Sequence, residues 1–115
     1  PSFGEGWGLT LSEAMATVAP CVSTSHTGTE DFFDERVGYV IDHSIRVQEM
    51  ANYKLTTSGY TPDTQSMLEK MFEVMRNYPK ALKKGRAASR RILEEFTWDK
   101  SARRMADILR RYKPC

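Results

Sequence analysis

The chain has 115 residues, of which 40% are hydrophobic and 28% are charged, with seven Gly, five Pro and two Cys. This composition fits one globular domain and excludes collagen-like, low-complexity and disulfide-scaffold proteins. No apolar run approaches the ~20 residues that cross a bilayer, so we predict no membrane-spanning helix. The sequence begins at Pro1 without a Met or a signal-peptide pattern, and we therefore expect it to be an excerpt of a longer protein.

The net charge of +2 is unevenly distributed along the chain. Residues 1–60 carry three Lys/Arg and eight Asp/Glu, a net −5, whereas residues 61–115 carry fourteen and seven, a net +7. An acidic front and a basic rear predict two different surfaces. Cys21 lies among small apolar residues and is predicted to be buried, while Cys115 is the last residue. Such sparse cysteine usage indicates a reducing, cytoplasmic compartment.

The front of the chain is predicted to alternate strand and helix. A helix is expected over residues 10–19, ended by Pro20, with strands over 21–24 and 37–41. A glycine loop, helix and strands in this order form half of a parallel α/β unit. Because two strands do not make a stable open sheet, we expect further strands upstream of this sequence.

The rear is predicted to be helical after a connecting segment. Residues 43–61 show no clear period and are predicted to be a loop. A helix is expected to begin with Thr61 as its cap, Pro62 at the first helical position and Asp63 in the first turn. Its apolar stripe, predicted to be core and not a cofactor site, consists of Met67, Leu68, Met71, Phe72 and Met75.

Two more helices complete the predicted helical segment 62–115. Pro79 opens the first, and Thr97 caps the second. The buried side of the first is predicted to comprise Leu82, Ile92, Leu93 and Phe96. The second carries apolar residues at intervals of four and three, namely Trp98, Ala102, Met105, Leu109 and Tyr112. A face this regular is expected to pack against another surface.

The stretch with the clearest chemistry lies at the front. Three glycines alternate with Glu5 and Trp7 just before the first predicted helix. Glycines allow backbone N–H groups to approach a ligand closely, and the helix N-terminus adds an anion site. Two carboxylates, Glu5 and Glu13, bracket this loop and suit the hydroxyls of a sugar. The pattern therefore fits a phosphate flanked by sugars, as in a nucleotide-sugar.

Five ordered motifs resemble those of the retaining GT-B glycosyltransferases, most closely glycosyltransferase family 4. They are Glu5-Gly6-Trp7-Gly8-Leu9 followed by Ser12-Glu13-Ala14-Met15-Ala16, then Pro20-Cys21-Val22-Ser23, Gly28-Thr29-Glu30-Asp31, Gly38-Tyr39-Val40-Ile41, and Arg86–Arg90 with Phe96-Thr97-Trp98-Asp99. The similarity covers most of the chain and is weakest over residues 43–61. Trp7 and Thr10 depart mildly from the Phe or Tyr and the Pro that family members usually have.

The resemblance implies an α/β, partial Rossmann-like fold in which short parallel strands precede several C-terminal helices. Residues 1–115 would be the C-terminal portion of the nucleotide-sugar-binding domain of a GT-B enzyme. Within it, residues 1–42 would form the donor-site segment and residues 62–115 the helical segment. The acceptor domain and the basic pair that grips the diphosphate would precede Pro1, so the isolated chain is expected to be inactive.

The resemblance also implies a role for each donor-site residue. The catalytic Glu5 would contact the donor sugar near the reaction centre, and Glu13 would bind the ribose hydroxyls. The sugar and distal phosphate would be held by the backbone amides of Gly6, Trp7, Gly8, Leu9 and Thr10. The implied reaction transfers a hexosyl-type group from a nucleoside-diphosphate sugar, with retention, to a sugar, lipid-linked or protein acceptor. No cofactor, metal or nucleic acid is expected, and peripheral membrane contact remains an option.

Plainer interpretations compete for several of these residues. Thr10 and Glu13 have the spacing of a helix-capping box, and Trp7 is expected to pack through its side chain. His26 and His43 are predicted to be surface or capping residues, since no paired spacing supports a metal site. The acids of a predicted short helix, with a solvated face, are Glu30, Asp31, Asp34 and Glu35.

Two other functions remain open from the sequence. The basic run Lys80–Arg91 is predicted to be a solvated helix face, but a non-catalytic module with such a run could dock on anionic membrane or nucleic acid. That alternative has no use for the glycine loop. The second is another GT-B enzyme, such as a nucleotide-sugar epimerase or a phosphorylase-like enzyme.

Overall fold

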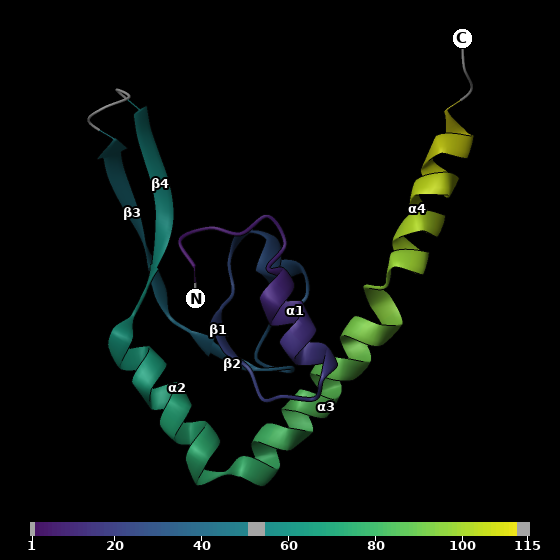
Figure 1. Cartoon of the computed structure of the whole chain (residues 1–115). Coiled ribbons are helices and arrows are strands. Elements are labelled where there is room, and N and C mark those ends of the chain that lie inside the picture. The colour runs from purple at the N-terminus through teal and green to yellow at the C-terminus, as the bar shows by residue number, and fades with distance from the viewer. Residues whose placement is uncertain (1, 51–54, 113–115) are drawn as a thin grey trace.

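A short parallel strand pair, a hairpin and a series of helices make up the chain. A computed structural model describes residues 2–50 and 55–112. In chain order the elements are α1 (Leu9–Ala16), β1 (Val22–Thr24), the 3-10 helix η1 (Thr27–Asp31), β2 (Tyr39–Ile41), β3 (His43–Met50), β4 (Leu55–Pro62), α2 (Thr64–Arg76), α3 (Tyr78–Glu95) and α4 (Trp98–Arg111). Figure 1 shows this arrangement. The fold is α/β, with short parallel strands followed by C-terminal helices, as predicted, and it is compatible with a partial Rossmann-like domain.

The parallel pair β1–β2 confirms the two predicted strands. Val22 lies opposite Tyr39 and Thr24 opposite Ile41. Helix α1 is shorter than the predicted 10–19, because the chain leaves the helix at Ala16 and Val18 has a positive φ of 69°. The chain therefore turns back toward β1 before it reaches the proline that was expected to end the helix.

The loop predicted over residues 43–61 is wrong, because this segment forms an antiparallel hairpin. β3 and β4 pair from His43 opposite Pro62 to Met50 opposite Leu55, while residues 51–54 lie outside the described part. Pro62 therefore ends a strand instead of opening a helix. Asp63, not Thr61, caps α2, because its carboxylate accepts a 2.6 Å hydrogen bond from the Ser66 amide.

The core lies where α1 and α3 cover the region of the parallel pair. Its buried apolar residues are Met15, Cys21, Phe32, Phe33, Val37, Ala88 and Ile92. Gly85 allows α3 to approach α1, since an added Cβ would collide with the Val18 carbonyl oxygen. The Ser89 hydroxyl adds a 2.8 Å hydrogen bond to the Ala16 carbonyl. These contacts hold the glycine loop on a packed platform.

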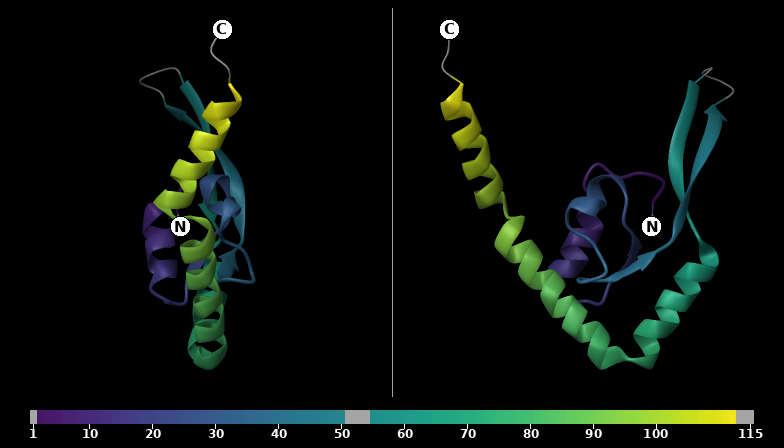
Figure 2. Two further views of the ribbon diagram at one scale, coloured as in Figure 1. Left: turned by 90° about the vertical axis from the view of Figure 1, so that its right-hand side faces the viewer. Right: turned by 180° about the vertical axis from the view of Figure 1, so that it is seen from behind.

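The hairpin and α4 project from this platform as two arms (Figure 1), and the molecule seen edge-on in Figure 2 is thin. Its extents are 58 × 45 × 16 Å and its radius of gyration is 17.5 Å, against about 13 Å for a compact domain of this length. No residue in α4 is buried, and Trp98 is 90% exposed. The expectation that this face packs on another surface is not met within the described residues.

Other predicted core positions are also exposed. Most of the predicted α2 stripe is accessible to solvent, so its assignment to the core is wrong, as it is for one α3 position. The exposed residues are Leu68, Met71, Phe72, Met75 and Leu93. Pro79 and Thr97 do start α3 and α4 as predicted: Pro79 lies in the first turn, and the Thr97 hydroxyl accepts a bond from the Lys100 amide.

Candidate functional site

The N-terminus of α1 is built on a left-handed glycine. Gly8 has φ 89° and is the N-cap, and the amides of Leu11 and Ser12 both donate to its carbonyl at 3.1 Å. The alternative capping box is therefore wrong, because the cap lies two residues before Thr10 and makes no side-chain cap bond. The amides of Leu9 and Thr10 lie in the first turn, where the helix offers them no acceptor, and so are available to a ligand.

The Glu5 peptide is held on both sides by η1. Its N–H donates to the Thr27 hydroxyl at 3.0 Å, and its carbonyl accepts from the Gly28 amide at 3.0 Å. A Cβ on Gly28 would collide with the Gly6 carbonyl oxygen, so the two segments meet backbone to backbone. The loop is consequently fixed by a contact between residues more than twenty positions apart in the sequence.

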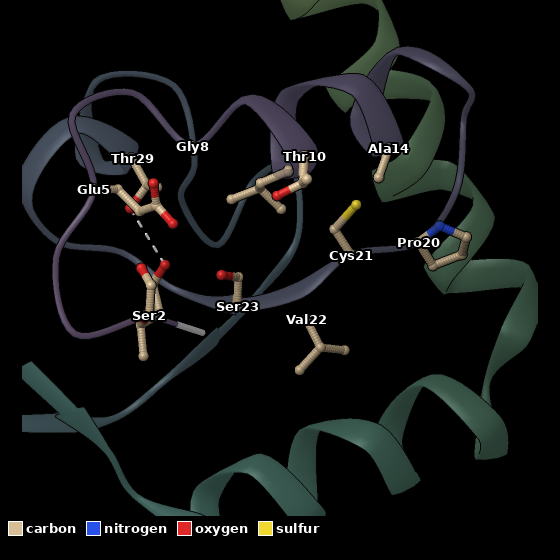
Figure 3. A pocket seen from close by; sticks show the side chains of 12 residues that line it. Ser2, Glu5, Gly8, Thr10, Ala14, Pro20, Cys21, Val22, Ser23 and Thr29 are labelled. Atoms are coloured by element: carbon tan, nitrogen blue, oxygen red, sulfur yellow. Dashed lines mark hydrogen bonds between the residues drawn. The ribbon is translucent and has the colours of Figure 1, made fainter.

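A hollow of about 420 Å³ lies between this loop, α1 and β1. Its lining residues are Ser2, Glu5, Gly8, Thr10, Leu11, Ala14, Pro20, Cys21, Val22, Ser23, Thr24 and Thr29. Figure 3 shows the Glu5 side chain directed into this space, opposite the hydroxyl of Ser23. Burial raises the pKa of the Cys21 thiol, which keeps it protonated. Among the lining residues named above, Glu5 is the one that carries a carboxylate.

The structure brings some of the predicted donor-site residues together and leaves others apart. Glu5, Gly8 and Thr10 line the hollow. Glu13 is exposed on α1 and is not among the lining residues. Exposed positions beside the hollow are Gly6 and Leu9.

The side chain of Trp7 packs against aromatic rings of the core and so supports the glycine loop. Its ring lies 4.6 Å from the ring of Phe32 and 5.2 Å from that of Phe96, measured between centroids. The prediction that this side chain packs is confirmed. The contact anchors the middle of the loop to the core and leaves only its backbone for a ligand.

Sequence reasoning missed the contribution of η1 and β1 to this site. Thr27 and Gly28 hold the loop, while Ser23 and Thr24 supply hydroxyl-bearing residues to the lining. The Gly-Thr-Glu-Asp turn was the available signal, since a glycine beside a glycine-rich loop permits close backbone approach.

The two histidines take a capping and a surface position, as predicted. His26 is the N-cap of η1, and its own amide donates to the Thr29 hydroxyl at 3.1 Å. His43 is exposed at the base of β3. Across residues 2–50 and 55–112, no group of three or more His, Cys, Asp or Glu side chains is placed to hold a metal ion.

Two of the acidic residues predicted to lie on a solvated face instead form ion pairs with cations of α3. Asp34 accepts from the Arg91 guanidinium at 3.1 Å, and Glu35 accepts from Lys84 at 3.0 Å. Burial works to raise the pKa of Asp34, but hydrogen bonds from Arg36 and Arg91 outweigh it and lower the pKa to about 2. Both partner cations on α3 have side chains only 17% exposed, so the basic run is not simply a solvated face.

These pairs also bear on the membrane or nucleic-acid alternative. Of the six Lys and Arg residues over 80–91, Lys80, Lys84 and Arg91 each pair with a carboxylate of the chain itself. Half of the positive charge in this run is thus already balanced. In the part of the chain that the structure describes, no helix has the length and apolar character to cross a membrane.

Fold and hollow together define the class: an α/β domain in which a helix N-terminus and one carboxylate meet at a hollow. A family model described as "Family 4 Glycosyltransferase in conflict systems" matches residues 1–105. The chain belongs to this family and is therefore a glycosyltransferase of family 4 type. No curated protein matches the chain, and no solved structure matches it either.

Proposed function

We propose that the hollow binds a nucleoside-diphosphate sugar, the donor of a glycosyl transfer that proceeds with retention in a longer GT-B protein. The observation that carries the proposal is the placement of Glu5 and the α1 N-terminus on one hollow. Amides at a helix N-terminus favour phosphate oxygens, and a carboxylate accepts hydrogen bonds from sugar hydroxyls. Family membership supports the same donor class.

The amides of Leu9 and Thr10, with the Thr10 hydroxyl, would bind the distal phosphate. Glu5 would accept from the hydroxyls of the sugar, close to the bond that breaks. Fixed donors at a leaving diphosphate stabilise the charge that develops there in the transition state. The Glu5 carboxylate would at the same time position the sugar as it gains oxocarbenium character.

Glu13 would bind the ribose hydroxyls, as the family resemblance implies. Its carboxylate is exposed and outside the hollow, so it would be reached only by a donor that extends past the helix N-terminus along α1. The two acids would therefore act on different parts of the ligand. Glu5 would bind the donor sugar and Glu13 the ribose of the nucleoside.

The charge of the hollow supports a site that another part of the protein completes. No Lys or Arg occurs among its described lining residues, while a nucleoside diphosphate carries at least two negative charges. We propose that residues 1–115 form the C-terminal portion of a donor domain, and that cationic side chains and the acceptor domain belong to the rest of a longer protein. The acceptor would be a sugar, a lipid-linked sugar or a protein, and no resident cofactor or metal is invoked.

Calorimetric titration of the chain with uridine, guanosine and adenosine diphosphate sugars tests the proposal, each beside the corresponding free diphosphate. At least one sugar donor should bind more tightly than its diphosphate. Glu5→Ala should abolish that difference and leave the diphosphate affinity within about twofold, since the loss is one charge-assisted hydrogen-bond partner on the sugar. The matched control is Glu94→Ala, which removes an exposed carboxylate on α3 outside the hollow.

The outcomes separate the proposal from the basic-module alternative. Binding that ignores the sugar, survives Glu5→Ala and weakens steeply with salt would overturn the donor site and favour charge-driven docking. Absence of binding by every donor, in this chain and in the longer protein alike, would overturn it as well. In the longer protein, Glu5→Gln should lower turnover far more than donor affinity, because the contact lies at the reacting sugar.

A further inference from the structure

His26 is the one buried histidine in the described chain, and the proposed chemistry does not use it. Its residue surface is only 2% exposed. The ring Nε2 lies 3.0 Å from the Thr24 hydroxyl, and Nδ1 lies 3.2 Å from the Thr27 hydroxyl. A buried imidazole with both nitrogens satisfied by hydroxyls has a defined orientation.

The hairpin fixes the plane of this ring. The Tyr60 ring on β4 stacks on it with centroids 4.4 Å apart and planes inclined by 11°, and His43 meets its edge at 5.2 Å. The Tyr60 amide also donates to the Phe3 carbonyl at 2.8 Å, which ties the start of the glycine loop to the same strand. His26 is thus held between the hairpin and the loop.

Thr27 connects this ring to the proposed donor site. Its hydroxyl lies within hydrogen-bond distance of His26 Nδ1 and accepts from the Glu5 amide at 3.0 Å. Thr27 has φ 52°, a left-handed conformation that β-branched residues rarely adopt. Such a conformation persists only where the surroundings determine it, and here the partners of its hydroxyl do so.

We propose that His26 is a positioning residue of the donor site, which acts through the Thr27 hydroxyl to fix the Glu5 peptide and hence the Glu5 carboxylate. The inference rests on the proposed function for its effect on ligand affinity. In the resulting hydrogen-bond series, the Thr27 hydroxyl donates to Nδ1, and Nε2–H donates to Thr24. This arrangement requires the neutral imidazole.

The surroundings favour that neutral form. Burial lowers the pKa of His26, and the nearby charge of His43 lowers it further. The Ser2 backbone and the Glu30 carboxylate act in the opposite direction and are outweighed. Protonation of His26 would place an N–H where Nδ1 accepts, so the Thr27 hydroxyl would lose its acceptor.

The experiment is a comparison of Thr27→Val with Thr27→Ser in the full 115-residue chain. Both variants keep a side chain at the same backbone position, but only Ser keeps the hydroxyl. Amide resonances of Glu5, followed by nuclear magnetic resonance, report the loop without any donor. Thr27→Val should speed exchange of the Glu5 amide and weaken donor binding by about three- to tenfold, the effect of one neutral hydrogen bond, and Thr27→Ser should restore both.

Two further variants separate positioning from a general loss of structure. His26→Phe preserves the stacked ring but removes both nitrogens, and it should reproduce the Thr27→Val changes at the Glu5 amide. Thr17→Val removes an exposed hydroxyl at the opposite end of α1, which bonds the Ala14 carbonyl, and it should leave that amide unchanged.

The outcomes keep this inference distinct from the proposed function. Unchanged Glu5 amide exchange in both Thr27→Val and His26→Phe would overturn the positioning role, even if the wild-type chain binds a donor. If neither the wild-type chain nor the longer protein binds a donor but the amide responds as expected, the predicted effect on donor affinity falls together with the proposed function. A response of the amide with unchanged donor affinity would overturn the link to the site alone.

Discussion

Replacing Gly28 by Ala tests the backbone contact that holds the glycine loop. The new Cβ would collide with the Gly6 carbonyl oxygen and lie 2.9 Å from the Trp7 Cα, and neither is a flexible side-chain end. The loop and η1 must therefore separate. Separation breaks the Gly28 amide bond to the Glu5 carbonyl and the Glu5 amide bond to the Thr27 hydroxyl.

The magnitude follows from these two hydrogen bonds. Each contributes about 0.5–1.5 kcal/mol, so their loss costs about 1–3 kcal/mol. The lower entropy of an unfolded chain with Ala offsets about 0.4–1 kcal/mol of this cost. A net loss of about 1–2 kcal/mol corresponds to a fall in Tm of about 5–10 °C for a domain of this size.

Thermal unfolding followed by circular dichroism measures this shift. Gly4→Ala is the matched control, because nothing lies within 4 Å of a Cβ at that position. Its Tm should equal that of wild type or exceed it slightly. If Gly28→Ala and Gly4→Ala unfold at the same temperature, the reasoning on the loop contact is refuted.

Three further predictions concern the rest of the chain. Asp63→Ala should destabilise the protein by about 1 kcal/mol in urea titration, through loss of the cap on α2. Acid titration should show stability held above pH about 4 and lost toward pH about 2 as Asp34 protonates, and Arg91→Met should reduce this loss. Trp98→Ala should change the Tm by less than 2 °C, because the residue is 90% exposed; a larger fall would show that the side chain is covered.

The predicted loss of stability in acid follows from the lowered pKa of Asp34. A carboxyl group with a folded pKa of about 2 and an unfolded value of 3.8 binds fewer protons when folded, so stability falls as the pH drops between these values. The side chain of Asp34 is 36% exposed, so solvent screening reduces its contribution to about 1 kcal/mol or less. A transition insensitive to Arg91→Met would contradict this assignment.

The parallel pair and the caps were predictable because their signals are local. β1 and β2 are short runs rich in β-branched residues with turn residues on either side. Thr97 and Pro79 have the chemistry of helix starts whatever lies around them. Glu5 could be placed at the site for a similar reason, since a carboxylate within a glycine loop before a helix has few structural roles.

The hairpin was not predictable from apolar periodicity. The exposed side chains of Ile45 and Val47 lie on a strand that covers no core, so alternation with a buried face is missing. Its strands are stabilised by pairing with each other, as the continuous register from His43 to Met50 shows. Pro62 then ends β4, and in sequence it was indistinguishable from a proline at the start of a helix.

Other features of the site could not be predicted because they depend on contacts between segments distant in the sequence. The clamp of Thr27 and Gly28 on Glu5 depends on a turn that brings distant backbone segments together. Burial was overestimated at α2 and α4, since an apolar stripe predicts a face but not what covers it. Glu13 matches its motif, but the motif does not show that its side chain lies on an exposed face of α1.

The outer edges of the β3–β4 ribbon have a consequence for handling the protein. In the described chain each strand pairs only with the other, so β3 has no strand partner on its far edge, whereas the far edge of β4 is partly covered because its Tyr60 amide donates to the Phe3 carbonyl. Ile45 and Val47, two residues apart on β3, add exposed β-branched side chains on one face of the ribbon, and Arg46 between them lies on the opposite face. At millimolar concentration, strand addition between molecules would compete with solubility, and light scattering should fall when Val47 is replaced by Lys.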